Sequence, residues 1–173
     1  MQLTGCAPDH AAPSGPSAQT SSAGPPSALW CVSADLRMSL RGGGAAMGTE
    51  TLAIDFTNIG ATACRLSGTP RVVLATGSPD HHLDSTTADS GSRSASDPVV
   101  TLAPGGQTTA LARYRVAYFN NGCDKAIADY FVVYPPESTT PTALPGSGAD
   151  NAAYYCRNPD RVYWDGVGAV GDR

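Results

Sequence analysis

Charge is scarce in this sequence. Only 15% of its 173 residues are Asp, Glu, Lys or Arg, and the formal net charge is −4. Nucleic-acid binding needs a basic patch to meet phosphates, and Arg113 and Arg115 are the nearest approach to one. No apolar run reaches the length of a membrane-spanning helix. The composition therefore argues against a nucleic-acid partner and against an integral membrane protein.

Recognisable catalytic motifs are missing as well. There is no G-x-S-x-G nucleophile elbow, and the histidines of the globular part, His81 and His82, are adjacent in a polar segment that offers no rigid support for a catalytic base. We therefore expect no catalytic residues, no cofactor and no enzymatic activity. A cell-envelope hydrolase is kept as a low-ranking alternative.

One polar segment does contain several potential metal ligands. They are Asp80, His81, His82, Asp84 and Asp89. Imidazole and carboxylate groups suit zinc or copper, but adjacent histidines on an extended chain point apart and rarely share one ion. We expect a solvated loop without a metal, and a metal-handling envelope protein that uses the His81-His82 loop is the alternative.

Alternating strands are the clearest features that are present. Residues 49–64 read TETLAIDFTNIGATAC, in which Leu52, Ile54 and Phe56 fall on one face and polar residues on the other. We interpret this segment as a central strand. Residues 32–41 alternate throughout and predict a partner strand, joined to it by a glycine-rich connection over 42–48.

Further strands are predicted along the chain, separated by polar loops over 76–98 and 137–151. They cover residues 71–75, 99–102, 108–119, 130–134, 154–156 and 161–164. The segment 130–134, YFVVY, is apolar on both faces and predicts a fully covered strand. Together these elements predict an all-β, immunoglobulin-like β-sandwich of about seven to nine strands over residues 30–173.

The N-terminus predicts an anchor and a tether. Residues 3–6, LTGC, resemble the lipobox of bacterial lipoproteins, in which the cysteine, here Cys6, receives a diacylglycerol. Only five residues precede Cys6, so a signal peptide would have to begin upstream of Met1. Residues 7–28 contain no large apolar side chain, which predicts a disordered tether within a first segment of 1–29. We expect an extracytoplasmic protein, attached to the membrane only through this lipid.

The other cysteines predict two disulfides. An antiparallel pairing of residues 32–41 with residues 49–58 places Cys31 close to Cys64, which favours a Cys31–Cys64 bridge and leaves Cys123 and Cys156 for the second. Four cysteines allow three pairings, so the sequence alone leaves the connectivity open.

Several segments together resemble an actinobacterial family of secreted proteins and lipoproteins, the domain of unknown function 4232. They are Cys31 before a first strand, LAIDFTNIG at 52–60, CRLSGTP at 64–70, VTLAPGG at 100–106, and Cys123. The resemblance covers residues 30–136 and implies an extracytoplasmic β-sandwich. It implies no activity and no functional residues.

Aromatic residues suggest a place for binding. Tyr118, Phe119 and Asn120 precede Cys123, and Tyr154 and Tyr155 precede Cys156, which would bring both groups beside the second disulfide. Aromatic rings next to polar side chains are common in recognition surfaces. We predict a monomeric, non-catalytic binding or structural module of the envelope that recognises a protein or a glycan through this region.

Overall fold

The described part of the chain is built almost entirely from β-strands. The computed structural model describes residues 28–85, 93–115, 124–146, 154–157, 160–162 and 164–171. Within these residues there are fourteen strands and one 3-10 helix, Ser33–Asp35, and no helix there is long and apolar enough to cross a membrane. The all-β, sandwich-like class is confirmed, although with more strands than the seven to nine expected.

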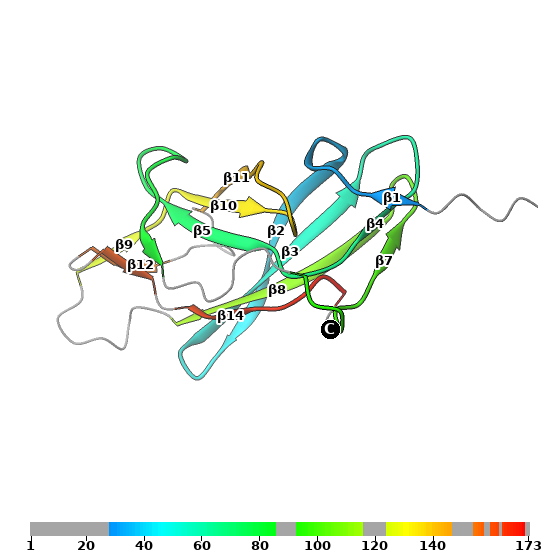
Figure 1. Cartoon of the computed structure of the whole chain (residues 1–173). Helices are drawn as coiled ribbons and strands as arrows, with labels where there is room; N and C mark the ends of the chain where they lie inside the picture. The colour runs from blue at the N-terminus through cyan, green and yellow to red at the C-terminus, as the bar shows by residue number, and fades with distance from the viewer. Residues whose placement is uncertain are drawn as a thin grey trace, which may run out of the picture.

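Two sheets form the layers of the sandwich (Figure 1). The longer sheet has the order β14-β8-β3-β2 and consists of β2 (Leu36–Ala46), β3 (Thr49–Asn58), β8 (Gln107–Arg115) and β14 (Trp164–Val167). The facing sheet has the order β11-β10-β5 and consists of β5 (Arg71–Ala75), β10 (Tyr130–Tyr134) and β11 (Thr142–Pro145). Every pairing within these two sheets is antiparallel.

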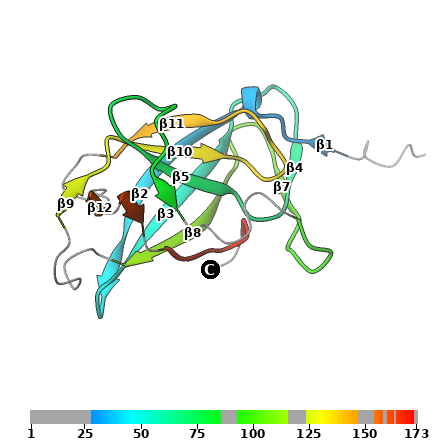
Figure 2. The same ribbon diagram turned by 60° about the vertical axis from the view of Figure 1, so that its left-hand side comes forward.

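Two smaller sheets lie at opposite ends of the molecule, as Figures 1 and 2 both show. One has the order β1-β4-β7, with β1 (Leu29–Trp30), β4 (Cys64–Leu66) and β7 (Val100–Leu102). The other has the order β6-β13-β12-β9, with β6 (Asp84–Ser85), β9 (Lys125–Ile127), β12 (Tyr154–Arg157) and β13 (Asp160–Val162). These short strands account for the excess over the expected number.

The core lies between the two layers and confirms the alternation of β3. Its fully buried side chains include Leu52, Ile54 and Phe56 of β3, Val72 and Leu74 of β5, and Phe131 and Val133 of β10. β3 is also central in its sheet, because it pairs with β2 on one side and β8 on the other. β10 is covered on both faces as expected, since Val132 and Tyr134 are buried in a second cluster with Val73 and Ala75.

The first long strand differs from its prediction at both ends. Residues 33–35 form the 3-10 helix, closed by the amide of Asp35 donating to the carbonyl of Val32, so β2 begins only at Leu36. At the other end β2 continues through the glycines to Ala46, with a register shift between Gly42 and Gly44. The turn is therefore Met47-Gly48 alone, at φ 50° and 84°, the signs of a type I′ hairpin.

Both predicted loops contain short strands. Residues 142–145 form β11 because they pair with the edge of β10, and residues 84–85 form β6 because they pair with β13. β6 pairs with a segment distant in sequence, which no local pattern announces, whereas β11 follows β10 closely and lies in a segment predicted from the sequence as a polar loop. Pairing also begins at Leu29, one residue before the predicted domain boundary. The predicted tether up to residue 27 lies outside the described residues.

The preferred first disulfide is present. Cys31 and Cys64 are bonded, with their Cα atoms 4.9 Å apart and a sequence separation of 33. Closing a loop of this size is worth about 3–4 kcal/mol in the chain-entropy account. Cys156 is also disulfide-bonded, but Cys123 lies outside the described residues, so its predicted partner stays a prediction.

A charged network lies on the outer face of the long sheet. Arg41 of β2 donates from both Nε and Nη2 to the carboxylate of Asp55 on β3, and the hydroxyl of Thr109 on β8 donates to Asp55 at 2.7 Å. The hydrogen bonds from Arg41 are the main cause that holds the pKa of Asp55 below its ordinary value; burial opposes them and Thr109 adds to them.

Asp55→Asn is therefore expected to lower the free energy of unfolding by about 1 kcal/mol at neutral pH. Because the pKa of Asp55 is lower in the folded chain than in the unfolded chain, its contribution is complete above the ordinary carboxyl pKa and is lost as the pH falls through the folded pKa. Urea unfolding of the wild-type and Asp55→Asn proteins measures this effect: the difference between their free energies of unfolding should shrink as the pH is lowered from about 5 to about 3. A difference that does not change with pH would contradict this assignment.

Candidate functional site

The aromatic surface predicted from the sequence is only partly described. Tyr118, Phe119 and Asn120 lie outside the described residues, as does the lipidation candidate Cys6. Tyr154 is half-buried on β12. Its neighbour Tyr155 is only 5% exposed and belongs to the core, so its inclusion in a binding surface is wrong.

The reason lies in the alternation of β12. Tyr154 and Tyr155 point to opposite faces of this strand, which pairs with β9 through Tyr155 and Ala126. The face that carries Tyr155 is turned toward the main core, where Ala126 packs as well. Adjacent aromatic residues in a strand therefore cannot both present their rings to a partner.

The histidine loop shows no assembled metal site. His81 and His82 are exposed, and the side chain of Asp84 and all of Asp89 lie outside the described residues. Within the described ranges, no group of three or more His, Cys, Asp and Glu side chains is placed to hold an ion.

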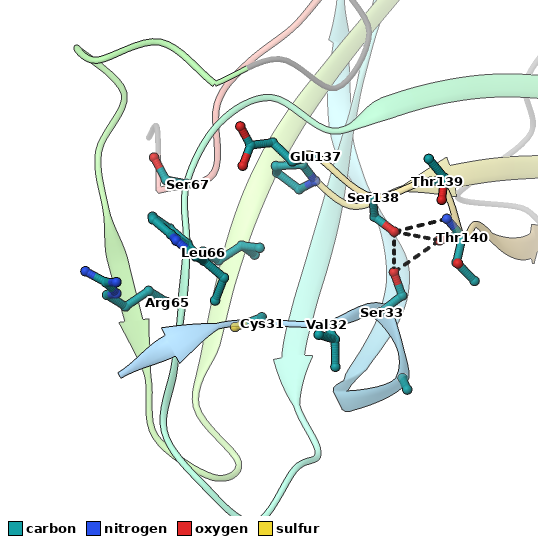
Figure 3. A pocket seen from close by; sticks show the side chains of 13 residues that line it. Cys31, Val32, Ser33, Arg65, Leu66, Ser67, Glu137, Ser138, Thr139 and Thr140 are labelled. Carbon is teal, nitrogen blue, oxygen red and sulfur yellow. Dashed lines mark hydrogen bonds between the residues drawn. The ribbon is translucent and has the colours of Figure 1, made fainter. Parts of the chain in front are cut away.

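A groove lies at the end of the sandwich that carries the β1-β4-β7 sheet. Its volume is about 520 Å³, within the range of small-ligand sites. Three segments line it: residues 30–34, which run from β1 into the 3-10 helix, residues 65–67, at the end of β4 and just after it, and residues 136–140, which follow β10. Figure 3 shows Ser33, Ser138 and Thr140 on one side, Arg65 and Ser67 on the other, and Glu137 between them.

Hydroxyl groups close one wall of the groove. The hydroxyls of Ser33 and Ser138, 105 residues apart in the sequence, are hydrogen-bonded at 2.5 Å. Ser33 also donates to the carbonyl of Thr140 at 3.2 Å, and the amide of Thr140 donates to the Ser138 hydroxyl at 3.1 Å. These bonds fasten the 3-10 helix to the turn after β10 and fix the width of the groove.

Trp30 and two arginines form the opposite side. Trp30 pairs with Arg65 across β1 and β4, and the guanidinium of Arg65 lies 4.6 Å from the centre of the indole ring. The guanidinium of Arg93 lies over the same ring at 4.3 Å. Both distances are within the range of cation–π attraction. Arg93 also approaches Glu137, with 3.5 Å between Nη1 and Oε2.

Two polar atoms in this wall have no hydrogen-bond partner in the described structure. They are Nε of Arg65 and Oγ of Ser67, and Ser67 is only 4% exposed. Buried polar groups are nearly always satisfied in folded proteins, because an unmade bond costs about 1–3 kcal/mol. Two such atoms in one wall of the groove distinguish it from the rest of the described structure.

Several exposed apolar side chains belong to the end of the sandwich that carries the groove, and two of them, Trp30 and Val32, line it. Of the seven large hydrophobic residues exposed in the described part of the chain, five belong to or flank the β1-β4-β7 sheet: Leu29, Trp30, Val32, Ile59 and Val99. We call these five residues, together with Arg65 and Arg93, the Trp30 surface. Leu29 is 80% exposed and Val32 56%.

Sequence reasoning missed this site, although one signal was available. Leu29 and Trp30 are large apolar residues that directly follow a long stretch without any, and they directly precede Cys31. The disulfide of Cys31 holds Leu29 and Trp30 beside β4. The contributions of residues 65–67 and 136–140 had no comparable signal, because Arg, Ser, Thr and Glu in a turn are ordinary solvated residues.

The fold and its disulfides define this protein as an all-β, disulfide-bonded sandwich-like domain. The family model of a domain of unknown function, number 4232, matches residues 31–162, and the chain belongs to that family. The match extends beyond the segment of 30–136 in which the resemblance was visible. No curated protein and no solved structure matches the chain.

The burial of Tyr155 leads to a stability prediction. Tyr155→Ala should lower the free energy of unfolding by about 3–5 kcal/mol, because it removes a large ring from the core. Tyr154→Ala, at the half-buried neighbouring position, should cost clearly less. Chemical denaturation of the two variants measures both effects, and equal losses would contradict the assignment of Tyr155 to the core.

Proposed function

We propose that this protein is a non-catalytic binding module of the cell envelope that recognises a protein partner through the Trp30 surface. The observation that carries the proposal is the exposure of several apolar side chains at one end of the sandwich, together with a tryptophan flanked by two guanidinium groups. Exposed apolar patches of this kind mark interaction sites, and Trp and Arg are enriched among the residues that dominate binding energy.

The shape of the surface supports a protein rather than a glycan as the partner. Leu29 and Val32 are aliphatic and widely exposed, which suits burial against another apolar surface. The faces of the Trp30 ring, on which a sugar would stack, are engaged by Arg65 and Arg93. A groove bordered by an apolar rim suits one or two side chains of the partner.

The place of action in this proposal is outside the cytoplasm. Disulfides persist in oxidising compartments, and this protein contains the Cys31–Cys64 disulfide, which supports an extracytoplasmic location. The lipobox-like LTGC segment makes Cys6 the site of lipidation, and the diacylglycerol would hold the domain at the outer face of the cytoplasmic membrane. Residues 7–28 would then act as a spacer between the membrane and the Trp30 surface.

Mass spectrometry tests the anchor. When the gene is expressed from its full upstream frame in an actinobacterial host, the mature protein should begin at Cys6 and carry the mass of its acyl chains. Cys6→Ser should abolish the acylation and release the protein from the membrane fraction. A wild-type protein that reaches the envelope without any acyl mass would refute this part of the proposal.

Site-directed crosslinking tests the interaction surface. A photoreactive residue at Val32 should crosslink a protein in intact envelopes, whereas the same residue at Met47, which is fully exposed at the tip of the β2–β3 hairpin, should not. Excess purified wild-type chain should compete for the crosslink, and the Trp30→Ala chain should compete at least tenfold less well, which corresponds to a loss of at least about 1.4 kcal/mol.

Three results would count against the interaction. Equal crosslinking from Val32 and Met47 would show that the Trp30 surface is not selective. Undiminished competition by the Trp30→Ala chain would remove Trp30 from the interface. A crosslinked species that glycosidases destroy and proteases leave intact would replace the protein partner with a glycan.

A further inference from the structure

We infer that the groove beside Trp30 binds a carboxylate of the partner, and that Glu137 occupies the place of that carboxylate in the free protein. The groove is thus a site for an acidic peptide segment, with Arg65 and Arg93 as its cationic side. This inference rests on the proposed function, because it names the chemical group by which the same surface recognises its partner.

The charge of the groove is the first observation. The chain has a net charge of −4, yet two cations accompany one anion here: Arg65 lines the groove with Glu137, and Arg93, which is not part of the lining, contacts Glu137 and Trp30. Arg93 and Glu137 are one-third and one-half exposed, and their closest approach is 3.5 Å. An ion pair that is this exposed to solvent contributes little to stability. Arg93 can therefore exchange Glu137 for the carboxylate of a partner at a small cost in free energy.

The backbone of Glu137 is the second observation. The amide of Ser138 donates to the carbonyl of Pro135 at 3.0 Å, which closes a turn with Pro136 and Glu137 at its centre. Glu137 has φ 57°, the left-handed region that glycine normally occupies at the third position of such a turn. A glutamate there has an unfavourable backbone, so the turn alone gives no reason for this residue.

Only one other described non-glycine residue, Met47, has a positive φ, and at both positions the turn itself calls for it. Met47 stands in a two-residue hairpin turn whose geometry requires positive φ at both positions. The two positions differ in their side chains: Met47 is fully exposed, whereas the side chain of Glu137 lines the groove and meets Arg93. Strained backbone is characteristic of functional sites, which agrees with a role for the Glu137 carboxylate in the groove.

The unpaired polar atoms are the third observation. Arg65 Nε and Ser67 Oγ lie in the same wall of the groove and lack partners among the described residues. A carboxylate accepts hydrogen bonds at both oxygens, and guanidinium groups bind it in a bidentate manner. A partner carboxylate bound in the groove would supply an acceptor of the kind that Arg65 Nε and Ser67 Oγ lack.

Peptide titration tests the inference. The probes are a blocked Gly-Glu repeat peptide and the matching Gly-Gln peptide, added to the full chain while the indole N–H resonance of Trp30 is followed by NMR. The Gly-Glu peptide should shift this resonance and the Gly-Gln peptide should not. Glu137→Gln keeps the size of the side chain and removes its charge, so it should tighten binding of the acidic peptide about two- to fivefold, the range of an exposed ion pair.

Two further variants separate the groove from general electrostatics. Arg93→Gln should weaken binding of the Gly-Glu peptide, whereas Arg37→Gln, which removes an equal charge from an exposed position on β2, should leave it unchanged. Three results would overturn the inference. The two peptides bind with equal strength, neither the wild-type chain nor any variant binds the Gly-Glu peptide, or Glu137→Gln binds the Gly-Glu peptide more weakly than the wild-type chain does. Crosslinking from Val32 that persists in any of these cases would show that the proposed interaction stands and that only its carboxylate selectivity has failed.

Discussion

The hydrogen bonds of Asn58 hold together the end of the sandwich on which the rest of this structure depends. Asn58 is the last residue of β3 and is completely buried. Its amide nitrogen donates to the carbonyls of Thr62 and Leu102, and its side-chain oxygen accepts from the amide of Gly60, each at 2.9 Å. Its backbone also exchanges hydrogen bonds with Gly105 and Gly106. Each polar group of a buried asparagine is thus used, which fixes the loop to β4 and the turn after β7 in one arrangement.

This arrangement connects the core of the fold with the candidate site. Asn58 sets the path of the chain from β3 into β4, and the disulfide then fastens Cys31 to the first residue of β4. The disulfide thereby places Trp30 beside Arg65. Trp30 belongs to β1, the edge strand of this sheet, which is only two residues long. A groove that depends on so short a strand needs the covalent bond, because two residues of pairing would not hold an exposed tryptophan in place.

The segments with strong periodicity were predictable, and the failures have physical causes. Residues 71–75 and 130–134 form strands with the predicted bounds, since apolar β-branched and aromatic residues there fit a covered sheet. Residues 32–35 alternate just as regularly but leave the sheet, because the disulfide and the 3-10 turn redirect the chain. The prediction for Tyr155 failed for another reason. Alternation places Tyr154 and Tyr155 on opposite faces of the strand, but it does not say which of the two faces packs against the core.

The sequence by itself determined the all-β class and the central place of β3, because strand periodicity is a local property that survives in any packing, and it favoured the first disulfide without settling the pairing. Only the tertiary structure decided the candidate site. Ser33 and Ser138 meet across 105 residues, and Arg65 and Glu137 come from strands and turns with no shared pattern. Such a groove arises where separate elements end beside one another, and the positions of those ends follow from packing of the whole domain.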